Sequence, residues 1–248
     1  MTTVTFFSYA PGRRLWAFNR MGSARRELGR VEGLRFWKLL GAGHGNGYSL
    51  RPDLSRYGLI GVWASPEAAS AFFTDSSLAA SWRANASEIW TVALRTLQTH
   101  GAWSGANPFS PLAEDNVAAT PGAPVAVLTR ASIRVSRLAP FWRSVPSTSE
   151  RLACAPGLLA SIGTGEAPAM RPATFSLWRS MDSMLEFAYG SDEHREVIRR
   201  RRDERWYTEE LFARFEPVVS RGTFDGRDPL AGLMDPLETG KHGELQWI

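Results

Sequence analysis

The sequence predicts an α+β protein in which two consecutive ferredoxin-like halves, each of the order β-α-β-β-α-β, pair their sheets as a dimeric α+β barrel. The first observation is that short strand-like apolar segments and longer segments of helical periodicity follow in the same order in both halves. The second is an internal repeat, in which paired tryptophans and two glycine-containing segments recur. The matched positions are Trp63 with Trp178, Trp90 with Trp206, Gly41–Gly43 with Gly163–Gly165, and Trp103–Gly105 with Phe224–Gly226.

The first half is predicted to begin with a strand from Val4 to Tyr9, which the Pro11-Gly12 pair ends. A helix is expected from Arg13 to Leu28, with Leu15, Phe18 and Met21 facing the core. Ser65 followed by Pro66 is a good helix start, because proline suits the first helical position. The remaining predictions are strands over residues 34–40, 57–63 and 91–98, a helix over residues 66–73, and a further helical piece reaching Trp90.

A stretch rich in Pro, Gly, Ala and Asn, residues 106–123, is predicted to link a first half of residues 1–105 to a second half of residues 124–226. Residues 227–248 are expected to form a tail that packs on the body or on a partner chain. Within the second half, strands are predicted over residues 124–135, 158–164, 173–178 and 209–219, and helices from Arg137 and, capped by Asp182, over residues 182–206.

Composition narrows the class of protein. Hydrophobic residues make up 44% of 248 residues, which suffices for a packed core. The net charge of +4 comes from arginine, since Lys38 and Lys241 are the two lysines. This excess of arginine favours carboxylate ligands or an anionic membrane surface, and the sequence contains no recognised nucleic-acid-binding module. Cys154, the one cysteine, excludes internal disulfides and multi-cysteine metal sites, and its apolar surroundings predict a buried structural thiol. Without a leader or a long apolar run, a cytoplasmic protein is expected, with peripheral membrane contact as an addition.

The segment from residue 191 to residue 215 holds the best candidate for a metal or haem ligand, His194. His194 shares a predicted helix face with Phe187, Val197 and Ile198, at spacings of three, four and seven. The four arginines that follow it, residues 199–202, span more than one helical turn, so one must point toward the His194 side and could bind a carboxylate such as a haem propionate. The alternative that His194 is a half-buried helix residue beside a solvated arginine surface stays open.

A glycine-rich segment, GAGHGNG at residues 41–47, follows a predicted strand without opening a helix, so it does not match a dinucleotide site. Its glycines permit close approach of the backbone to a ligand, and His44 within it is either a distal acid or base or an exposed turn residue. No nucleophile elbow or HExxH motif is present, and His100 and His242 lie in polar, loop-like contexts.

At this point the sequence resembles the spheroidene monooxygenase family, the carotenoid-oxygenating enzymes of purple bacteria. The resemblance covers nearly the whole chain in conserved order. It is carried by the blocks WAFNRMG (16–22), FWKLLGAGHGNGYSLRP (36–52), WSGANPF (103–109), VLTRASIR (127–134), FWRSVP (141–146), IGTGEAP (162–168) and HREVIRRRRDERWYTEELFARF (194–215).

This resemblance implies a haem-dependent monooxygenase that hydroxylates, and by repetition ketolates, a hydrophobic carotenoid-like substrate. It implies O2 and an electron donor such as ferredoxin as co-reactants, and a homo-oligomer. By position in the matching blocks, His194 is implied as the axial ligand and Arg199 and Arg202 as haem contacts. The opposite pocket wall would come from Phe36, Gly41 and Gly43 as cofactor-binding residues, with Trp37, Lys38 and His44 as catalytic candidates. Glu166, Glu209 or Glu210 could orient His194.

The chain departs from the family pattern in one loop, where GAGHGNGY stands in place of GSGTGEGF. His44, Asn46 and Tyr48 are the replacements, so the substrate could be smaller or more polar than a carotenoid. Two alternatives therefore remain: a dehydratase or peroxidase-like haem enzyme on the same barrel with His44 as acid or base, and a cofactor-free oxygenase or ligand-binding barrel with a structural His194.

Overall fold

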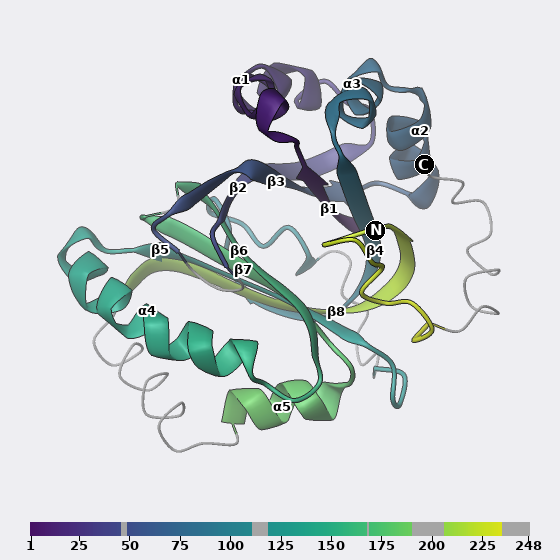
Figure 1. The fold of residues 1–248 in the computed structure, drawn as a ribbon. Helices are drawn as coiled ribbons and strands as arrows, with labels where there is room; N and C mark the ends of the chain where they lie inside the picture. Colours follow the sequence, from purple (N-terminus) through teal and green to yellow (C-terminus); the bar gives the residue numbers. More distant parts are fainter. Residues whose placement is uncertain (46–48, 111–118, 168, 190–205, 235–248) are drawn as a thin grey trace.

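Eight antiparallel strands close into one barrel in the computed structural model, with helices on its outside (Figure 1). The structure describes residues 1–45, 49–110, 119–167, 169–189 and 206–234. Around the barrel the strands follow the order β1-β3-β2-β6-β7-β5-β8-β4. Each half therefore contributes four neighbouring strands in ferredoxin-like order, which confirms the predicted fold class.

The elements keep the predicted order with shifted ends. In the first half they are β1 (Thr2–Ser8), a short 3-10 helix (Pro11–Arg13), α1 (Arg14–Leu28), β2 (Leu34–Gly43), β3 (Pro52–Trp63), α2 (Pro66–Asp75), α3 (Ser77–Asn85) and β4 (Glu88–Gly101). In the second half they are β5 (Val125–Ile133), a short 3-10 helix (Val135–Arg137), α4 (Leu138–Ala153), β6 (Leu158–Ala167), β7 (Arg171–Trp178), α5 (Met181–Tyr189) and β8 (Tyr207–Gly222).

The two halves join at two seams related by an approximate twofold. At the short seam β2 pairs with β6, and Gly41 lies opposite Gly165 while Ala42 lies opposite Thr164. The two segments matched in the sequence repeat thus pair with each other, as equivalent residues do around a twofold axis. The long seam pairs β4 with β8, from Trp90 opposite Gly222 to Gly101 opposite Leu211.

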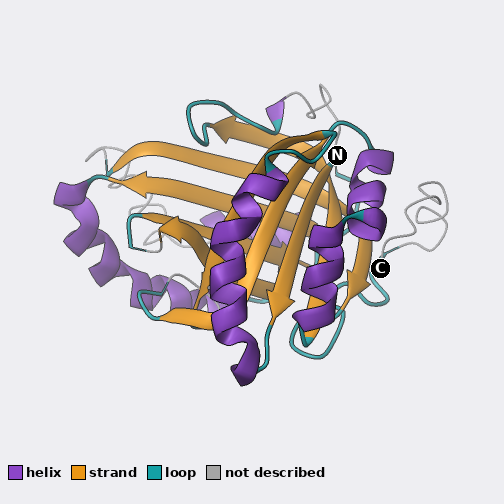
Figure 2. Cartoon of the chain, turned by 90° about the horizontal axis from the view of Figure 1, so that it is seen from above, coloured by secondary structure: helices purple, strands orange, loops and turns teal. Residues whose placement is uncertain are grey.

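Alternation along the strands separates the barrel interior from the layer beneath the helices. In β2, Leu40 and Ala42 face the interior, whereas Leu39 packs beneath the first-half helices. Figure 2, seen from above, shows helices lying across the outside of the strands. Local signals position these helices: the Ser65 side chain accepts a hydrogen bond from the Ala68 N–H at the start of α2, and Ser76 accepts one from Ala79 in α3.

Helix α1 corrects the predicted core face. Leu15 is 73% exposed and Phe18 is 59% exposed, whereas Ala17, Ala24 and Leu28 are buried. The buried residues recur at spacings of seven and four, so they share one face, and two alanines let the helix lie close to the sheet. The prediction that Leu15, Phe18 and Met21 face the core is therefore wrong for Leu15 and Phe18, and Met21 is only partly buried.

The repeat is confirmed at one tryptophan pair and wrong at the other. Trp63 and Trp178 each end a strand and are buried beneath the helices of their half. Trp90 lies inside β4, not at the end of a helix, and faces the barrel interior, while Trp206 packs on the helix side just before β8. Gly101 ends β4 as Gly222 ends β8.

Both of these glycines have positive φ, 84° for Gly101 and 82° for Gly222. A Cβ atom at either would run into a backbone carbonyl of the partner strand, that of Glu210 or Ile89. The shared geometry makes Gly101 and Gly222 equivalent positions of the two halves, and counting back from them makes Leu211 the equivalent of Trp90.

Three further predictions are corrected, and several others concern residues outside the described part of the chain. Cys154 is exposed, because it follows the last turn of α4 where the chain turns to solvent. His100 lies in β4, not in a loop, and stacks on Phe212 with ring centroids 5.2 Å apart. At the start of α5, Ser180 rather than Asp182 accepts the capping hydrogen bond, from the Ser183 N–H. His194, Arg199, Arg202, Asn46, Tyr48 and His242 lie outside the described residues, as does the predicted helix beyond α5.

Candidate active site

A charged cluster lies at one end of the barrel interior, where β2, β5, β6 and β8 meet. Its charged members are Lys38, Arg130, Glu166 and Glu209, and Trp103 lies among them. In β5, alternation puts Arg130 on the interior face with Ala126 and Leu128, and its side chain is only 3% exposed. Two cations and two carboxylates thus balance in a largely buried setting, which is the condition for burying charge at tolerable cost.

Glu166 is the centre of this charged cluster. Its Oε1 accepts a hydrogen bond from Lys38 Nζ at 2.8 Å, and its Oε2 accepts one from Trp103 Nε1 at 2.9 Å. An Arg130 nitrogen lies 3.9 Å from Oε2. Burial opposes ionisation of Glu166, but the hydrogen bonds from Lys38 and Trp103 and the charges of Lys38 and Arg130 outweigh it. These groups hold the pKa of Glu166 below its usual range.

Glu209 links Arg130 to a tight turn. Its carboxylate accepts hydrogen bonds from the backbone N–H groups of Ser104, at 3.1 Å, and Gly105, at 2.7 Å, and from Arg130. Burial raises the pKa of Glu209, whereas the Gly105 and Ser104 N–H groups and Arg130 lower it more, so the pKa lies below its usual range. Lys38 Nζ also donates to the Ser104 hydroxyl at 2.8 Å, which closes the cluster around the turn.

The opposite end of the barrel repeats the turn without the whole cluster. There the N–H groups of Asp225 and Gly226 donate to Glu88, as those of Ser104 and Gly105 donate to Glu209. Ser104 and Asp225 are the two described non-glycine residues with positive φ, 62° and 54°. The turn over a carboxylate is therefore a structural feature of both halves, whereas the described Lys38–Glu166–Arg130 arrangement belongs to one end and is the candidate for a functional role.

Phe36 and Lys38 lie together at this cluster. Lys38 Nζ is 5.5 Å from the centroid of the Phe36 ring, and Phe36 meets Trp103 edge to face at 5.7 Å. Trp37 lies on the opposite face of β2 and packs with the first-half helix layer. The structure therefore separates Trp37 from the two residues on either side of it.

The other described candidates lie farther along β2 and its hairpin. Gly41 pairs with Gly165 at the short seam, and a Cβ atom at Gly43 would press against Ser49. His44 is exposed and its N–H donates to the Arg51 carbonyl. His44 is six positions after Lys38, which corresponds to about 20 Å at the rise of a strand. These two catalytic candidates do not form one constellation.

Arg130 and Trp103 are the members of the cluster that sequence reasoning did not name as site residues. The sequence did contain a signal for Arg130. It alternates with Ala126 and Leu128 on the inward-facing side of β5, where a cation needs a buried partner. Glu166 and Glu209 were named as residues that could orient His194, which lies outside the described residues; among the described residues they bind Lys38, Trp103 and Arg130.

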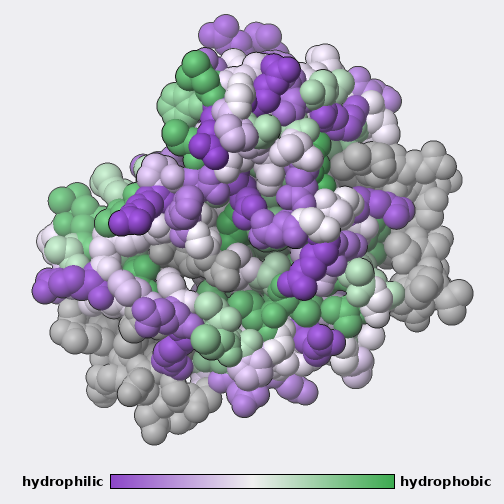
Figure 3. Space-filling view, in the orientation of Figure 1, coloured by the Kyte–Doolittle hydropathy of each residue, from purple (hydrophilic) through white to green (hydrophobic). Residues whose placement is uncertain are grey.

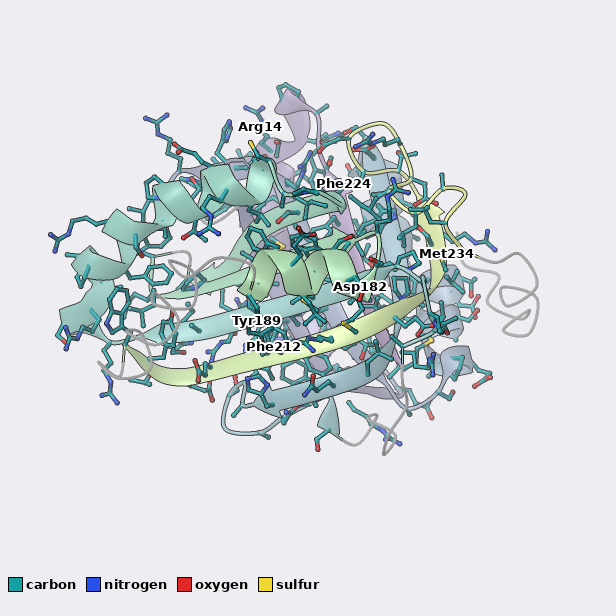
Figure 4. All side chains as sticks on the ribbon, turned by 90° about the horizontal axis from the view of Figure 1, so that it is seen from below. Arg14, Asp182, Tyr189, Phe212, Phe224 and Met234 are labelled. Atoms are coloured by element: carbon teal, nitrogen blue, oxygen red, sulfur yellow. The ribbon has the colours of Figure 1, made fainter. Side chains whose placement is uncertain are left out.

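Helix α5, the last described helix before His194 in the sequence, lies on the outer face of the second half. In Figure 4, α5 runs from Asp182 to Tyr189 across the strands, near Phe212 of β8. The described side chains under α4 and α5 form two separate apolar clusters, one around Trp178 and one around Phe141, whereas one continuous cluster fills the corresponding layer of the first half. Among the described residues, no group of three or more His, Cys, Asp or Glu side chains is placed to hold a metal ion.

The fold and this site define a class: barrels built from two ferredoxin-like halves with outer helices. Aldoxime dehydratase shares this fold, with a TM-score of 0.52 at 12% identity over 87% of this chain and 80% of that one. A family model described as a domain of unknown function, DUF3291, matches residues 127–214. Spheroidene monooxygenase from Rhodobacter capsulatus is 35% identical over 90% of this chain and 92% of the relative, and that from Rubrivivax gelatinosus is 37% identical over 88% and 82%. The chain belongs to the spheroidene monooxygenase family.

Membership of this family supports an oxidoreductase of the monooxygenase type. No helix in the described part of the chain is long and apolar enough to cross a membrane.

Proposed function

We propose that this protein is a haem-dependent monooxygenase that hydroxylates, and by repetition ketolates, a hydrophobic carotenoid-like substrate with O2 and electrons from a donor such as ferredoxin. The observation that carries the proposal is the identity of 35–37% to spheroidene monooxygenases along nearly the whole chain. An identity spread over both halves covers the barrel, its outer helices and the charged cluster alike, so it supports the same overall use of the fold.

His194 would hold the haem iron, and Arg199 and Arg202 would bind the carboxylates of the haem. The donor set suits the group, because a neutral imidazole binds iron and arginine binds carboxylates through paired hydrogen bonds. Beneath α4 and α5 the second half holds an apolar cluster around Trp178, with Phe187 partly buried against it, and a flat macrocycle needs apolar surroundings of this kind. Bound haem would supply the oxygen chemistry, while the protein positions the substrate and limits water.

Lys38 is proposed as the residue that holds a proton at the charged end of the barrel. Its side chain is 16% exposed and its ammonium group donates to Glu166 and Ser104, so Lys38 is held in place while part of its side chain reaches solvent. Reduction of O2 consumes protons, and a protonated amine against an ionised carboxylate can deliver one and recover it from water. Phe36, Gly41 and Gly43 are proposed for the apolar wall, and Trp37, which packs with the first-half helix layer, is proposed as a packing residue.

The first experiment compares the absorbance spectrum of the purified protein, after reconstitution with haem, with those of His194→Ala and His100→Ala. We expect a Soret band in the wild type that is shifted or lost in H194A and unchanged in H100A, because His100 is an exposed strand residue stacked on Phe212. Hydroxylation of an acyclic carotenoid is then measured by mass spectrometry with O2 and reduced ferredoxin. A reconstituted wild type without a Soret band would overturn the haem assignment.

If the protein shows a Soret band but its turnover needs no external electrons, the assignment changes from a monooxygenase to a dehydratase or peroxidase-like enzyme. Sensitivity of that turnover to His44→Ala would identify its acid or base.

A further inference from the structure

Helix α1 presents an outward row of residues that the fold leaves uncovered. Leu15, Phe18, Gly22 and Arg26 are spaced by three, four and four, so they share one face, opposite the buried face of Ala17, Ala24 and Leu28. Leu15 is 73% exposed and Phe18 is 59% exposed. In Figure 3, hydrophobic residues lie beside strongly hydrophilic ones on the part of the surface around α1. Two large apolar side chains adjacent on one outward face are a feature that solvent alone does not favour.

The charges around this row have one sign. Arg14 and Arg25 flank Phe18 at spacings of four and seven, and Arg26 continues the row itself; all three are exposed. Glu27 is the one acidic residue of α1, and it binds Arg20 through two hydrogen bonds, of 2.6 and 3.0 Å. The acid of the helix is thus neutralised within the helix, and the outward face keeps its positive charge.

We propose that α1 is a docking surface for an anionic lipid bilayer, with Leu15 and Phe18 in the interface and Arg14, Arg25 and Arg26 at the lipid phosphates. Exposed apolar residues flanked by arginines on one helix face are the arrangement that lies in the plane of a membrane interface. Arginines bind phosphate, and the attraction adds about fivefold in partitioning for each arginine near an anionic surface. This α1 docking surface is inferred without reference to the haem or the reaction.

A second copy of the chain is a poorer occupant of the same surface. In a twofold contact each patch meets itself, so Arg14, Arg25 and Arg26 would face the same arginines of the other copy. The described outward face of α1 has no free carboxylate to pair with them. An anionic bilayer satisfies both the apolar residues and the arginines at once.

The test is co-sedimentation of the full-length protein with vesicles of phosphatidylcholine alone and of phosphatidylcholine mixed with phosphatidylglycerol. We expect binding to the mixed vesicles only, weakened by high salt because the attraction is screened. The double variant L15S/F18S should lose at least about tenfold in partitioning, and R14Q/R25Q/R26Q about a hundredfold. Val135→Ser is the matched control: Val135 is 72% exposed on the second half, and its loss should leave binding unchanged.

The variants change exposed side chains only, and circular dichroism and thermal melting are used to check that each variant is folded. Absence of wild-type binding to the mixed vesicles would overturn the proposal, as would equal losses in L15S/F18S and V135S. Size-exclusion chromatography without lipid shows whether L15S/F18S separates a dimer; if it does, α1 is an interface between copies and the membrane assignment is wrong. Because no turnover is measured, failure here leaves the proposed reaction standing, and loss of the Soret band leaves lipid binding standing.

Discussion

Replacing Arg130 by methionine tests whether the charged cluster stabilises the barrel. The Arg130 side chain is 3% exposed and lies between Glu209, which accepts its hydrogen bond, and Glu166 at 3.9 Å. Methionine keeps much of the apolar volume and removes the charge, leaving two carboxylates, 21% and 15% exposed, without their shared cation. Removing one partner of a buried pair costs about 3–5 kcal/mol, and partial exposure of the carboxylates puts the expected loss near the lower end, about 3 kcal/mol.

The assay is equilibrium unfolding in urea at neutral pH, read by far-ultraviolet circular dichroism. Arg20→Met is the matched control, because the Arg20–Glu27 pair lies on the surface of α1, where such pairs contribute about 0–1 kcal/mol. The double variant R130M/E209Q should lose less than the sum of the two single losses, since the second change removes the stranded carboxylate. A loss in R130M no larger than in R20M would refute the reasoning.

The same variant changes the dependence of stability on pH. The pKa values of Glu166 and Glu209 are lowered in the folded protein, so the stability they contribute is present above their unfolded pKa and is lost as the pH falls through the folded pKa. Without Arg130 both folded pKa values rise toward the unfolded value. The acid-side decline of the free energy of unfolding should therefore be smaller in R130M and be complete at a higher pH, while its onset, which the unfolded pKa values set, stays the same. An unchanged pH profile would contradict the assigned cause.

Three further outcomes follow from single sites. Gly101→Ala should destabilise the protein by more than about 1 kcal/mol, because its Cβ would meet the Glu210 carbonyl, whereas Gly105→Ala, with positive φ but open space around it, should cost about 1 kcal/mol; equal losses in urea unfolding would contradict this. Tyr57→Phe should be neutral or stabilising by up to about 1 kcal/mol, because the buried Tyr57 hydroxyl has no hydrogen-bond partner among the described atoms; a loss above that size in thermal melting would reveal a partner. Lys38→Met should lower kcat by about tenfold or more with the Soret band retained. Lys38→Arg should lose rate as well, because arginine keeps the charge but does not give up its proton; a rate kept in Lys38→Arg, or equal rates in all three proteins, would remove Lys38 from proton delivery.

The sequence predicted the fold well because two independent patterns agreed. Strand and helix periodicities gave the order of elements, and the recurrence of Gly41–Gly43 as Gly163–Gly165 indicated the pseudo-twofold that the short seam displays. The predicted buried face of α1 was wrong because the prediction ranked Leu15 and Phe18 above alanine by hydrophobicity. Close packing of the helix on the sheet instead buries the small residues Ala17 and Ala24. Whether Trp90 ends a helix or lies in a strand depends on pairing with β1, a contact across the chain that no local pattern contains.

The candidate site was predictable residue by residue only where a local motif marked it. Phe36 and Lys38 came from one signature and do lie together, but the choice between Lys38 and Trp37 depends on which face of β2 is inward. Arg130 was missed because a lone arginine in a strand gives no hint of its partners. Those partners come from β6 and β8, which only barrel closure brings beside β5 and β2.

Five of the blocks that carry the family resemblance meet in this one cluster. Lys38, Trp103, Arg130, Glu166 and Glu209 come from separate blocks, spread over more than half of the chain, and each contacts at least one of the others. Because these residues contact one another at one place in the barrel, a single structural constraint accounts for the family resemblance of blocks that lie far apart in the sequence. The last block also contains His194, and the described chain resumes at Trp206, three residues before Glu209.

The end of the barrel that holds the cluster is thus the end at which the His194 block enters β8. If the cluster only stabilises the barrel, R130M lowers the free energy of unfolding and leaves the Soret band and the turnover per folded molecule unchanged. If it also delivers protons, K38M lowers turnover at an unchanged Soret band and an unchanged affinity for substrate. His194→Ala gives the reverse pattern, with loss of the band and little change in unfolding of the haem-free protein. Measured together on one preparation, the three variants separate support of the fold, delivery of protons and binding of haem.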